Sequence, residues 1–243
     1  MAEIDIVLVR PKEDGNVGAV ARLARNFGAA RLVLVAPRAR VGSEARRRAM
    51  AGLGHLEQAL RVPDFETAVA PADFVVGTTD LSTGRSTAYL RRSVSPERLG
   101  EMVEPMRGRL ALAFGPEDNG LSRRELARCD LLVHIPARRE FPTLNLSHAV
   151  AVVLYAIHRA SRPPSDLSTP APEVIELNGR EKELFLERLS ALLARTRYPA
   201  HKRRGLILLA RRVLGRANPT EAEYRMMLGV LRSIERQMPK GAR

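Results

Sequence analysis

The chain of 243 residues has one cysteine, no tryptophan and few aromatic side chains of any kind, which make up 4% of it. With Cys129 as its one thiol, it forms no intramolecular disulfide and no cysteine-based zinc finger. Its five histidines are scattered, so no metal site is expected. It lacks an apolar run near the ~20 residues of a membrane span, and it does not begin with a secretory signal. These absences favour a cytoplasmic protein.

Lysine is also scarce, with 4 residues among 40 basic ones, yet arginine gives the chain a net charge of +13. Residues 161–243 carry 17 basic and 9 acidic side chains, whereas residues 1–160 carry 23 and 18. Between Arg195 and Arg216 there are eight basic residues and no acid. A stretch of one sign indicates a polyanionic partner. A membrane surface is the competing partner, but it would favour interfacial tryptophan or phenylalanine.

The first two-thirds of the chain alternates predicted strands with predicted helices. Short apolar runs predict strands at 4–9, 32–36, 73–79, 109–114 and 131–135. Helices are expected at 16–27 ending at Gly28, at 43–52, from Asp64 to Ala70, after Ser95, from the capping box Ser122–Glu125, and from Ser147 to about Ser161. Continuous apolar strands with helices between them predict a parallel sheet with helices on both faces.

A proline-rich segment divides this region from a second one. Residues 162–173 contain almost no apolar side chains and read as a linker. Three helix patterns follow, at 178–195, 201–214 and 220–237. We therefore expect an α/β domain at 1–161, a linker at 162–177 and a small basic helical domain at 178–243.

Three unusual segments follow predicted strands, at the sheet edge where open parallel sheets carry their sites. The first, at 14–28, contains Asn16, Gly18 and Arg22. The second is FGPEDNGL at 114–121, and the third is IPARREFPTLNLSHAV at 135–150. Each alone fits a structural role, as a helix cap or a glycine-rich turn. None has the spacing of a dinucleotide or nucleoside-triphosphate fingerprint.

Taken together, the three segments resemble the motifs of the SpoU (TrmH-type) branch of the SPOUT methyltransferases. The first motif, N-x-G-x-x-x-R, is matched by Asn16, Gly18 and Arg22. The second, F-G-x-E-x-x-G-L, is matched by residues 114–121. The third joins I-P at 135–136 to S/T-L-N-L-S-x-A-V at 143–150. The tail at 210–237 is similar to that of the TrmJ subgroup, which 2′-O-methylates tRNA at nucleotide 32 of the anticodon loop.

The resemblance implies a fold, a methyl donor and an assembly. It implies a SPOUT α/β domain with a trefoil knot at its C-terminal end, S-adenosylmethionine as donor, no metal, and a homodimer. General topology rules do not lead to such a knot. By position in the motifs, the donor would lie against Thr78, Thr79, Asp80, Gly115, Ile135, Pro142, Thr143 and Leu144.

The resemblance also assigns the catalytic role to Arg22, acting on the donor bound by the other subunit. A guanidinium keeps its proton to a pH above ~12. We therefore expect Arg22 to stabilise the developing alkoxide and grip the adjacent phosphate instead of acting as a base. Asn16 would orient the same group, while Glu117 and Asn145 would fix Arg22 and the loops.

The basic helical domain is expected to bind the body of tRNA through Arg203, Arg204, Arg211 and Arg212. Two other functions remain open. An rRNA 2′-O-methyltransferase shares all three motifs, but an N-terminal RNA-binding domain would favour it, and the first strand is expected at residue 4. The second is an inactive RNA-binding protein on the same fold. Intact Asn16, Arg22, Glu117 and Asn145 speak against it.

Overall fold

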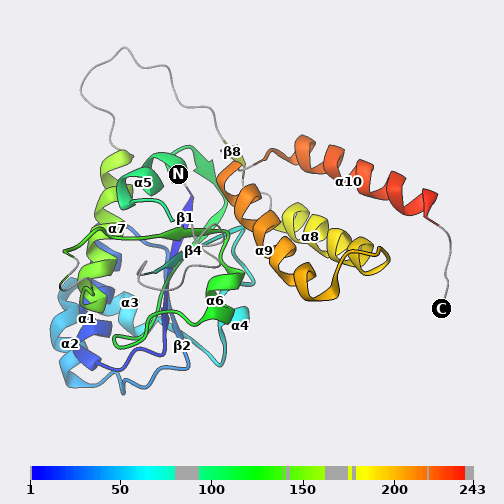
Figure 1. Cartoon of the computed structure of the whole chain (residues 1–243). Helices are drawn as coiled ribbons and strands as arrows, with labels where there is room; N and C mark the ends of the chain where they lie inside the picture. Colours follow the sequence, from blue (N-terminus) through cyan, green and yellow to red (C-terminus); the bar gives the residue numbers. More distant parts are fainter. Residues whose placement is uncertain are drawn as a thin grey trace, which may run out of the picture.

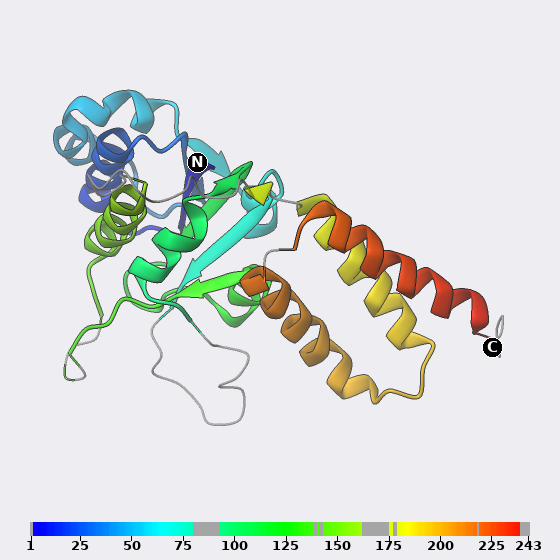
Figure 2. The same ribbon diagram turned by 90° about the horizontal axis from the view of Figure 1, so that it is seen from above.

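The computed structural model describes residues 2–79, 93–138, 140, 143–161, 175–176, 179–217 and 219–238. Figure 1 shows an α/β unit from which a group of C-terminal helices projects. Figure 2 shows the same projection from above, with the last of these helices, drawn in red, extending away from the α/β unit. The division into domains at the expected boundaries stays a prediction.

Six parallel strands form the central sheet in the order β3-β2-β1-β6-β4-β7. They are β1 (Glu3–Val9), β2 (Arg31–Val35), β3 (Leu60–Val62), β4 (Phe74–Thr78), β6 (Arg109–Phe114) and β7 (Leu131–Val133). The predicted parallel sheet is confirmed. The sequence analysis missed β3, a three-residue edge strand that is mostly exposed and therefore lacks an apolar run.

Helices cover both faces of the sheet. They are α1 (Asp14–Phe27), α2 (Ser43–Ala49), the short 3-10 helix η1 (Met50–Gly52), α3 (Leu53–Glu57), α4 (Phe65–Val69), α5 (Pro96–Val103), α6 (Arg123–Arg128) and α7 (Leu146–Ala160). The helical group contains α8 (Gly179–Ala194), α9 (Ala200–Ala217) and α10 (Glu221–Gln237). Within the described residues, no helix is both long and apolar enough to cross a bilayer.

Alternate side chains of each strand enter two separate cores. On one face Ile4, Ile6 and Leu8 of β1 pack with the buried sides of α1, α5 and α7. On the other face Val7 and Val9 pack with α4 and the residues around α6. This alternation is the period-two pattern of a strand buried on both sides. The knot stays a prediction.

Most of the predicted helix ends are confirmed. Helix α1 ends at Gly28 in the left-handed conformation, and Asp64 caps α4 by accepting from the Thr67 amide at 2.7 Å. Ser122 and Glu125 form the expected capping box of α6. Two predictions were wrong in detail. The helix expected at 43–52 breaks into α2 and η1, and Asn145 caps α7, not Ser147.

The linker expected at 162–177 is described only at residues 175–176, since the rest lies outside the described residues. These two residues form β8 (Ile175–Glu176), which pairs in parallel with β5 (Met106–Arg107) of the α/β unit. The predicted linker therefore contains a short paired strand. Beyond it, α8 packs against both α9 and α10, and the three expected helices are confirmed to within a few residues.

A buried cluster of charges joins the helical group to the sheet. Asp130 is fully buried just before β7, and it accepts from Lys182 Nζ at 2.7 Å and from Arg211 at 3.1 Å. Lys182 also donates to the carbonyl of Asp73, just before β4. Because Asp73 and Asp130 precede their strands, the helical group is attached at the amino ends of the sheet.

Candidate functional site

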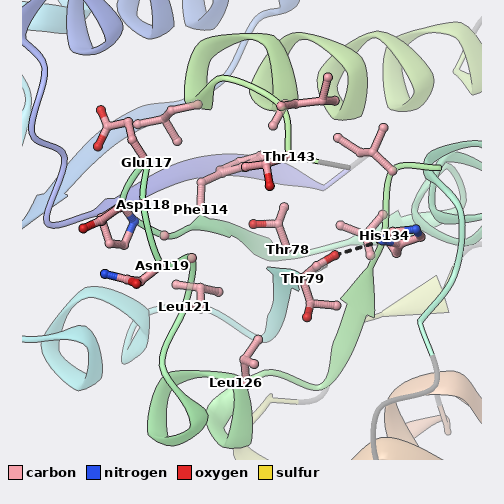
Figure 3. Close-up of a pocket in the computed structure, with 18 of the residues that line it drawn as sticks. Thr78, Thr79, Phe114, Glu117, Asp118, Asn119, Leu121, Leu126, His134 and Thr143 are labelled. Atoms are coloured by element: carbon pink, nitrogen blue, oxygen red, sulfur yellow. Dashed lines mark hydrogen bonds between the residues drawn. The ribbon is translucent and has the colours of Figure 1, made fainter. Parts of the chain in front are cut away.

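The carboxyl ends of β4, β6 and β7 surround a cavity of about 410 Å³. Figure 3 shows Thr78 and Thr79 from β4, Phe114 from β6 and Thr143 from the segment before α7 around the same space. Its volume lies within the range of small-molecule sites, and its position is the usual one in an open parallel sheet. It is the candidate active site.

Six of the eight residues expected to hold the donor line this cavity. They are Thr78, Thr79, Gly115, Ile135, Thr143 and Leu144. The other two, Asp80 and Pro142, lie outside the described residues. Segments more than 60 residues apart in the sequence thus meet at one place. Their role in donor binding remains a prediction.

The loop after β6 is folded tightly back on itself. A Cβ atom on Gly115 would lie 2.0 Å from the carbonyl carbon of Gly120, a distance that no side chain tolerates. Gly120 itself has φ +61°, in the left-handed region that favours glycine. The two glycines of the second motif therefore shape the wall of the cavity, because Gly115 leaves no room for a Cβ atom and Gly120 has a backbone conformation that favours glycine.

Glu117 ties this loop to the beginning of α1. Its carboxylate accepts from the side-chain nitrogen of Asn16 at 2.9 Å and from the backbone amides of Lys12 and Glu13 at 3.1 and 3.3 Å. Asn16 is 2% exposed, so its amide is held in the protein interior. The first and second motifs are thus joined by a hydrogen-bond network around Glu117, which also lines the cavity.

Next to this network, Lys12 Nζ and the Asp118 carboxylate form an ion pair of 2.5 Å. The hydrogen bond from Lys12 holds the pKa of Asp118 below its ordinary value. Asp118 lines the cavity beside Glu117 and Arg123, so charged side chains of both signs lie along this wall.

Another wall of the cavity is formed by β4, β7 and the segment that follows β7. Thr78 donates its hydroxyl to the Ala113 carbonyl at 3.1 Å, and the Thr79 amide donates to the Val133 carbonyl at 3.0 Å. A ring nitrogen of His134 lies 3.1 Å from the Thr79 carbonyl oxygen, the contact dashed in Figure 3. These bonds lock the neighbouring strand ends together, so the cavity is largely formed in advance of ligand binding.

Arg22 stands apart from this cavity. It is exposed on α1, it does not line the cavity, and it makes no hydrogen bond or ion pair with any described residue. No hydrogen bond or ion pair joins Arg22 to Glu117 or Asn145 within the described residues of this chain, so their expected role in fixing Arg22 stays a prediction. Asn145 instead accepts from the Ser147 amide and hydroxyl at 2.9 and 2.8 Å.

Several cavity residues were missed in the sequence analysis. Phe114 and His134 stand at the ends of β6 and β7, while Asn119, Arg123 and Leu126 come from the loop after β6 and from α6. The position of Phe114 and His134 at strand ends was a usable signal, because parallel strands bring their carboxyl ends to one edge. Leu126 carried no such signal, since its place depends on how α6 packs.

The four arginines expected to bind RNA divide into two pairs. Arg204 is exposed on α9, and Arg203 is half-buried with its guanidinium donating to the carbonyls of Tyr198 and Thr196. Arg211 and Arg212 are 6% and 3% exposed. The prediction that those two bind RNA is wrong here, because their charged groups face the α/β unit.

The lining of the cavity suits S-adenosylmethionine. Phe114, Leu121 and Leu144 offer apolar surface for a purine ring, whereas Thr78 and Thr79 offer hydroxyls for polar groups. The carboxylates of Glu117 and Asp118 offer acceptors to a ligand that carries a sulfonium and an ammonium charge. The residues present therefore fit the donor that the motifs imply.

Comparison with known proteins gives the family. Residues 3–155 match the model of the SpoU rRNA Methylase family. The chain belongs to this family. Two curated relatives show the same sequence identity to this chain. One is a tRNA (cytidine-2'-O-)-methyltransferase TrmJ of Methanocaldococcus jannaschii, 32% identical over 88% of this chain and 92% of that protein. The other is a tRNA (cytidine/uridine-2'-O-)-methyltransferase TrmJ of Salmonella typhimurium, 32% identical over 98% of both.

A solved structure supports the same assignment for this SpoU family member. The crystal structure of TrmJ from Z. mobilis has a TM-score of 0.71 to it at 29% identity, and the match covers 96% of this chain and 100% of that one. The similarity therefore extends through the helical group as well as the α/β unit.

Proposed function

We propose that this chain transfers a methyl group from S-adenosylmethionine to a ribose 2′-hydroxyl of tRNA, at nucleotide 32 of the anticodon loop. The observation that carries the proposal is the single cavity at the carboxyl ends of β4, β6 and β7, which gathers the second and third motifs of the family. The full-length similarity to tRNA 2′-O-methyltransferases, helical group included, supports tRNA as the substrate.

The donor supplies a methyl group already activated by its sulfonium. The remaining task falls to the chain itself, because a ribose hydroxyl is a poor nucleophile at neutral pH. The chain must hold the hydroxyl in line with the methyl group and stabilise the negative charge that develops on its oxygen. An arginine does both, since its planar fork binds a phosphate and its charge persists at neutral pH.

Arg22 takes this role in the proposal, from the partner of a homodimer. Arg22 does not line the cavity of its own chain, and among the described residues it makes no hydrogen bond or ion pair. The outer side of α7 also carries apolar side chains, with Val152 37% and Tyr155 56% exposed. Helix α7 packs beside α1. A dimer formed through these helices would cover the apolar surface and bring Arg22 toward the partner's cavity.

Glu117, Asn16 and Asn145 act as positioning residues in this scheme. Glu117 and Asn16 hold the loop after β6 against the start of α1, and Asn145 fixes the first turn of α7. Gly115, Thr78, Thr79, Ile135, Thr143 and Leu144 would contact the donor, since they line the cavity.

The competing substrate is rRNA, which the family description names. A direct test presents the purified chain with labelled S-adenosylmethionine and either total tRNA or ribosomal RNA lacking bound protein. We expect label in tRNA, mapped to the ribose of nucleotide 32 by its resistance to alkaline hydrolysis. Label in rRNA alone would replace the proposed substrate, and no transfer to either RNA would contradict an enzymatic function.

A further inference from the structure

A second hollow lies far from the candidate active site, on the helical group. It is a groove of about 530 Å³ between the C-terminal parts of α8 and α10. The residues that line it are four arginines, one acid and one methionine: Arg188, Arg195, Arg232, Arg236, Glu235 and Met238. Among the described residues, the lining thus contains four arginines and one acid, and the charge argument below depends on Arg188, Arg232 and Arg236.

The groove differs from a common arrangement in which basic residues sit in the last turn of a helix, near its free carbonyl groups. Arg236 has that position in α10. Arg188, however, lies in the middle of α8, and Arg232 lies more than one turn before the end of α10. The gathering of arginines from two helices at one place is therefore not explained by capping.

Within the groove, positive charge is poorly balanced. Arg188 reaches Glu235 at 3.4 Å, and its Nε atom is buried with no hydrogen-bond partner among the described residues. Arg232 and Arg236 are exposed and make no ion pair or hydrogen bond in the part of the chain that the structure describes. A buried donor without a partner costs free energy, as does the repulsion of like charges. An anion in the groove would relieve the repulsion among the arginines.

We propose that this groove binds the phosphodiester backbone of RNA. The proposal deepens the proposed function, on which it rests for the identity of that RNA as the tRNA substrate. Arginine forks bind phosphate oxygens in pairs. None of the described residues lining the groove is aromatic, so it offers no surface on which bases would stack. The groove therefore contributes affinity without reading sequence.

The position of the groove determines which step it affects. The helical group is attached at the amino ends of β4 and β7, whereas the cavity lies at their carboxyl ends. The groove lies toward the far end of that group, near the C-termini of α8 and α10 (Figure 2). It therefore holds a part of the RNA remote from the reacting ribose. Loss of the groove should raise KM for RNA and leave kcat and donor binding unchanged.

The test compares two double variants of the full-length chain. Arg232→Ala/Arg236→Ala removes two groove charges, and Arg180→Ala/Arg225→Ala removes two exposed charges from the same helices outside the groove. We expect the groove variant to bind tRNA about tenfold more weakly and to lower the slope of log affinity against log salt by about 2. Equal effects of the two variants, or none, would overturn the proposal.

A third variant should change affinity in the opposite direction, which no folding defect would do. Glu235→Gln removes the one acid among the described residues that line the groove, and we expect tRNA affinity to rise by about two- to fivefold. Unrelated duplex RNA should show the same ordering of the variants. An effect limited to tRNA, or weaker binding by Glu235→Gln, would contradict a backbone site.

The wild-type chain separates this inference from the proposed function. If it methylates tRNA while the groove variant keeps its affinity and salt dependence, the groove proposal fails alone. If it binds RNA through the groove but methylates no tRNA, the proposed substrate fails and the groove stands.

Discussion

Arg22 and Arg211 have the same side chain, but their surroundings give them different chemistry. Arg22 is exposed and has no partner among the described residues. Arg211 is buried, and burial opposes its charge, yet hydrogen bonds to Glu183 and the charge of Asp130 raise its pKa. A free guanidinium can bind a reacting group, whereas one held by two carboxylates serves structure.

Replacement of Arg22 tests its catalytic role. We expect Arg22→Ala to lower kcat by about a hundredfold or more, because the developing oxyanion loses its cation. Donor affinity, measured by calorimetry, should stay close to wild type, since Arg22 does not line the cavity. Arg22→Lys should also be poor, because an ammonium lacks the planar fork. Normal turnover in Arg22→Ala would remove Arg22 from the mechanism.

Cys129 should be inert despite being the one thiol of the chain. It is fully buried, its sulfur donates to the Glu125 carbonyl at 3.3 Å, and burial raises its pKa to about 12. The thiolate is the reactive form, so a thiol reagent should modify Cys129 only after denaturant unfolds the chain. Cys129→Ser should keep methyl transfer. Fast labelling of the folded protein, with loss of activity, would indicate a functional thiol instead.

At the scale of an element, the fold of the loop after β6 depends on Gly115 having no Cβ atom. Gly115→Ala would place a Cβ 2.0 Å from backbone, so the loop would have to move and the cavity wall with it. We expect donor affinity to fall at least tenfold in calorimetry. Gly54→Ala is the matched control, because its Cβ meets open space in α3. Unchanged donor affinity in Gly115→Ala would mean that this wall does not contact the donor.

The contact between α8 and α9 should depend on pH through Glu183. Burial opposes the charge of Glu183, but hydrogen bonds and the charge of Arg211 outweigh it, so its pKa lies below the ordinary 4.5. A carboxyl group whose pKa is lower in the folded chain than in the unfolded chain stabilises the fold at any pH above its unfolded-state pKa. That stabilisation is lost as the pH falls through its folded-state pKa.

Glu183→Gln should therefore lower Tm at pH 7 by about 2–4 °C, as expected for ~1 kcal/mol in a chain of this size. The difference from wild type should shrink as pH falls below 4.5. Glu221→Gln, which breaks an exposed pair with Arg225, should change Tm little at either pH. A Tm difference for Glu183→Gln that persists undiminished at pH 3 would contradict the assignment.

At the scale of the whole molecule, the proposed methyl-transfer site and the proposed RNA-binding helical group of one subunit are at opposite ends of the sheet strands. The cavity lies at the carboxyl ends of the strands, and the helical group at the amino ends. An RNA held by the helical group must therefore extend to reach a reacting centre. A second subunit that supplies Arg22 would complete that centre.

Complementation between two impaired variants tests this arrangement, with the donor kept below the concentration that would saturate Gly115→Ala. Arg22→Ala lacks the proposed catalytic cation, and Gly115→Ala lacks the proposed donor site. If Arg22 acts on the partner's cavity, a hybrid dimer made by co-expression has one intact centre, made of Arg22 from one subunit and the cavity from the other. Methyl transfer should then return toward a quarter of wild type in the mixed population. Activity no higher than that of either variant alone would place Arg22 in its own subunit's site.

The sequence determined the local elements and the chemistry of the motifs. Strands such as β6 were predicted to the residue because a continuous apolar run has few alternatives to a buried strand. The capping box at Ser122 was also predicted correctly, since a cap involves residues three apart. The gathering of Thr78, Gly115 and Thr143 at one cavity agrees with the resemblance to the family, which assigned all three to one donor site.

Tertiary structure alone decided which arginine side chains are exposed and which are buried in ion pairs. Arg204 and Arg211 stand seven residues apart in one acid-free run, yet Arg204 is exposed and Arg211 is buried against Asp130. The sequence could not separate them, because Asp130 precedes a strand 81 residues away along the chain. The groove between α8 and α10 has the same origin, since its arginines meet only when two helices pack side by side. Charge and cap patterns are local properties of a chain, whereas burial depends on what packs against each side chain.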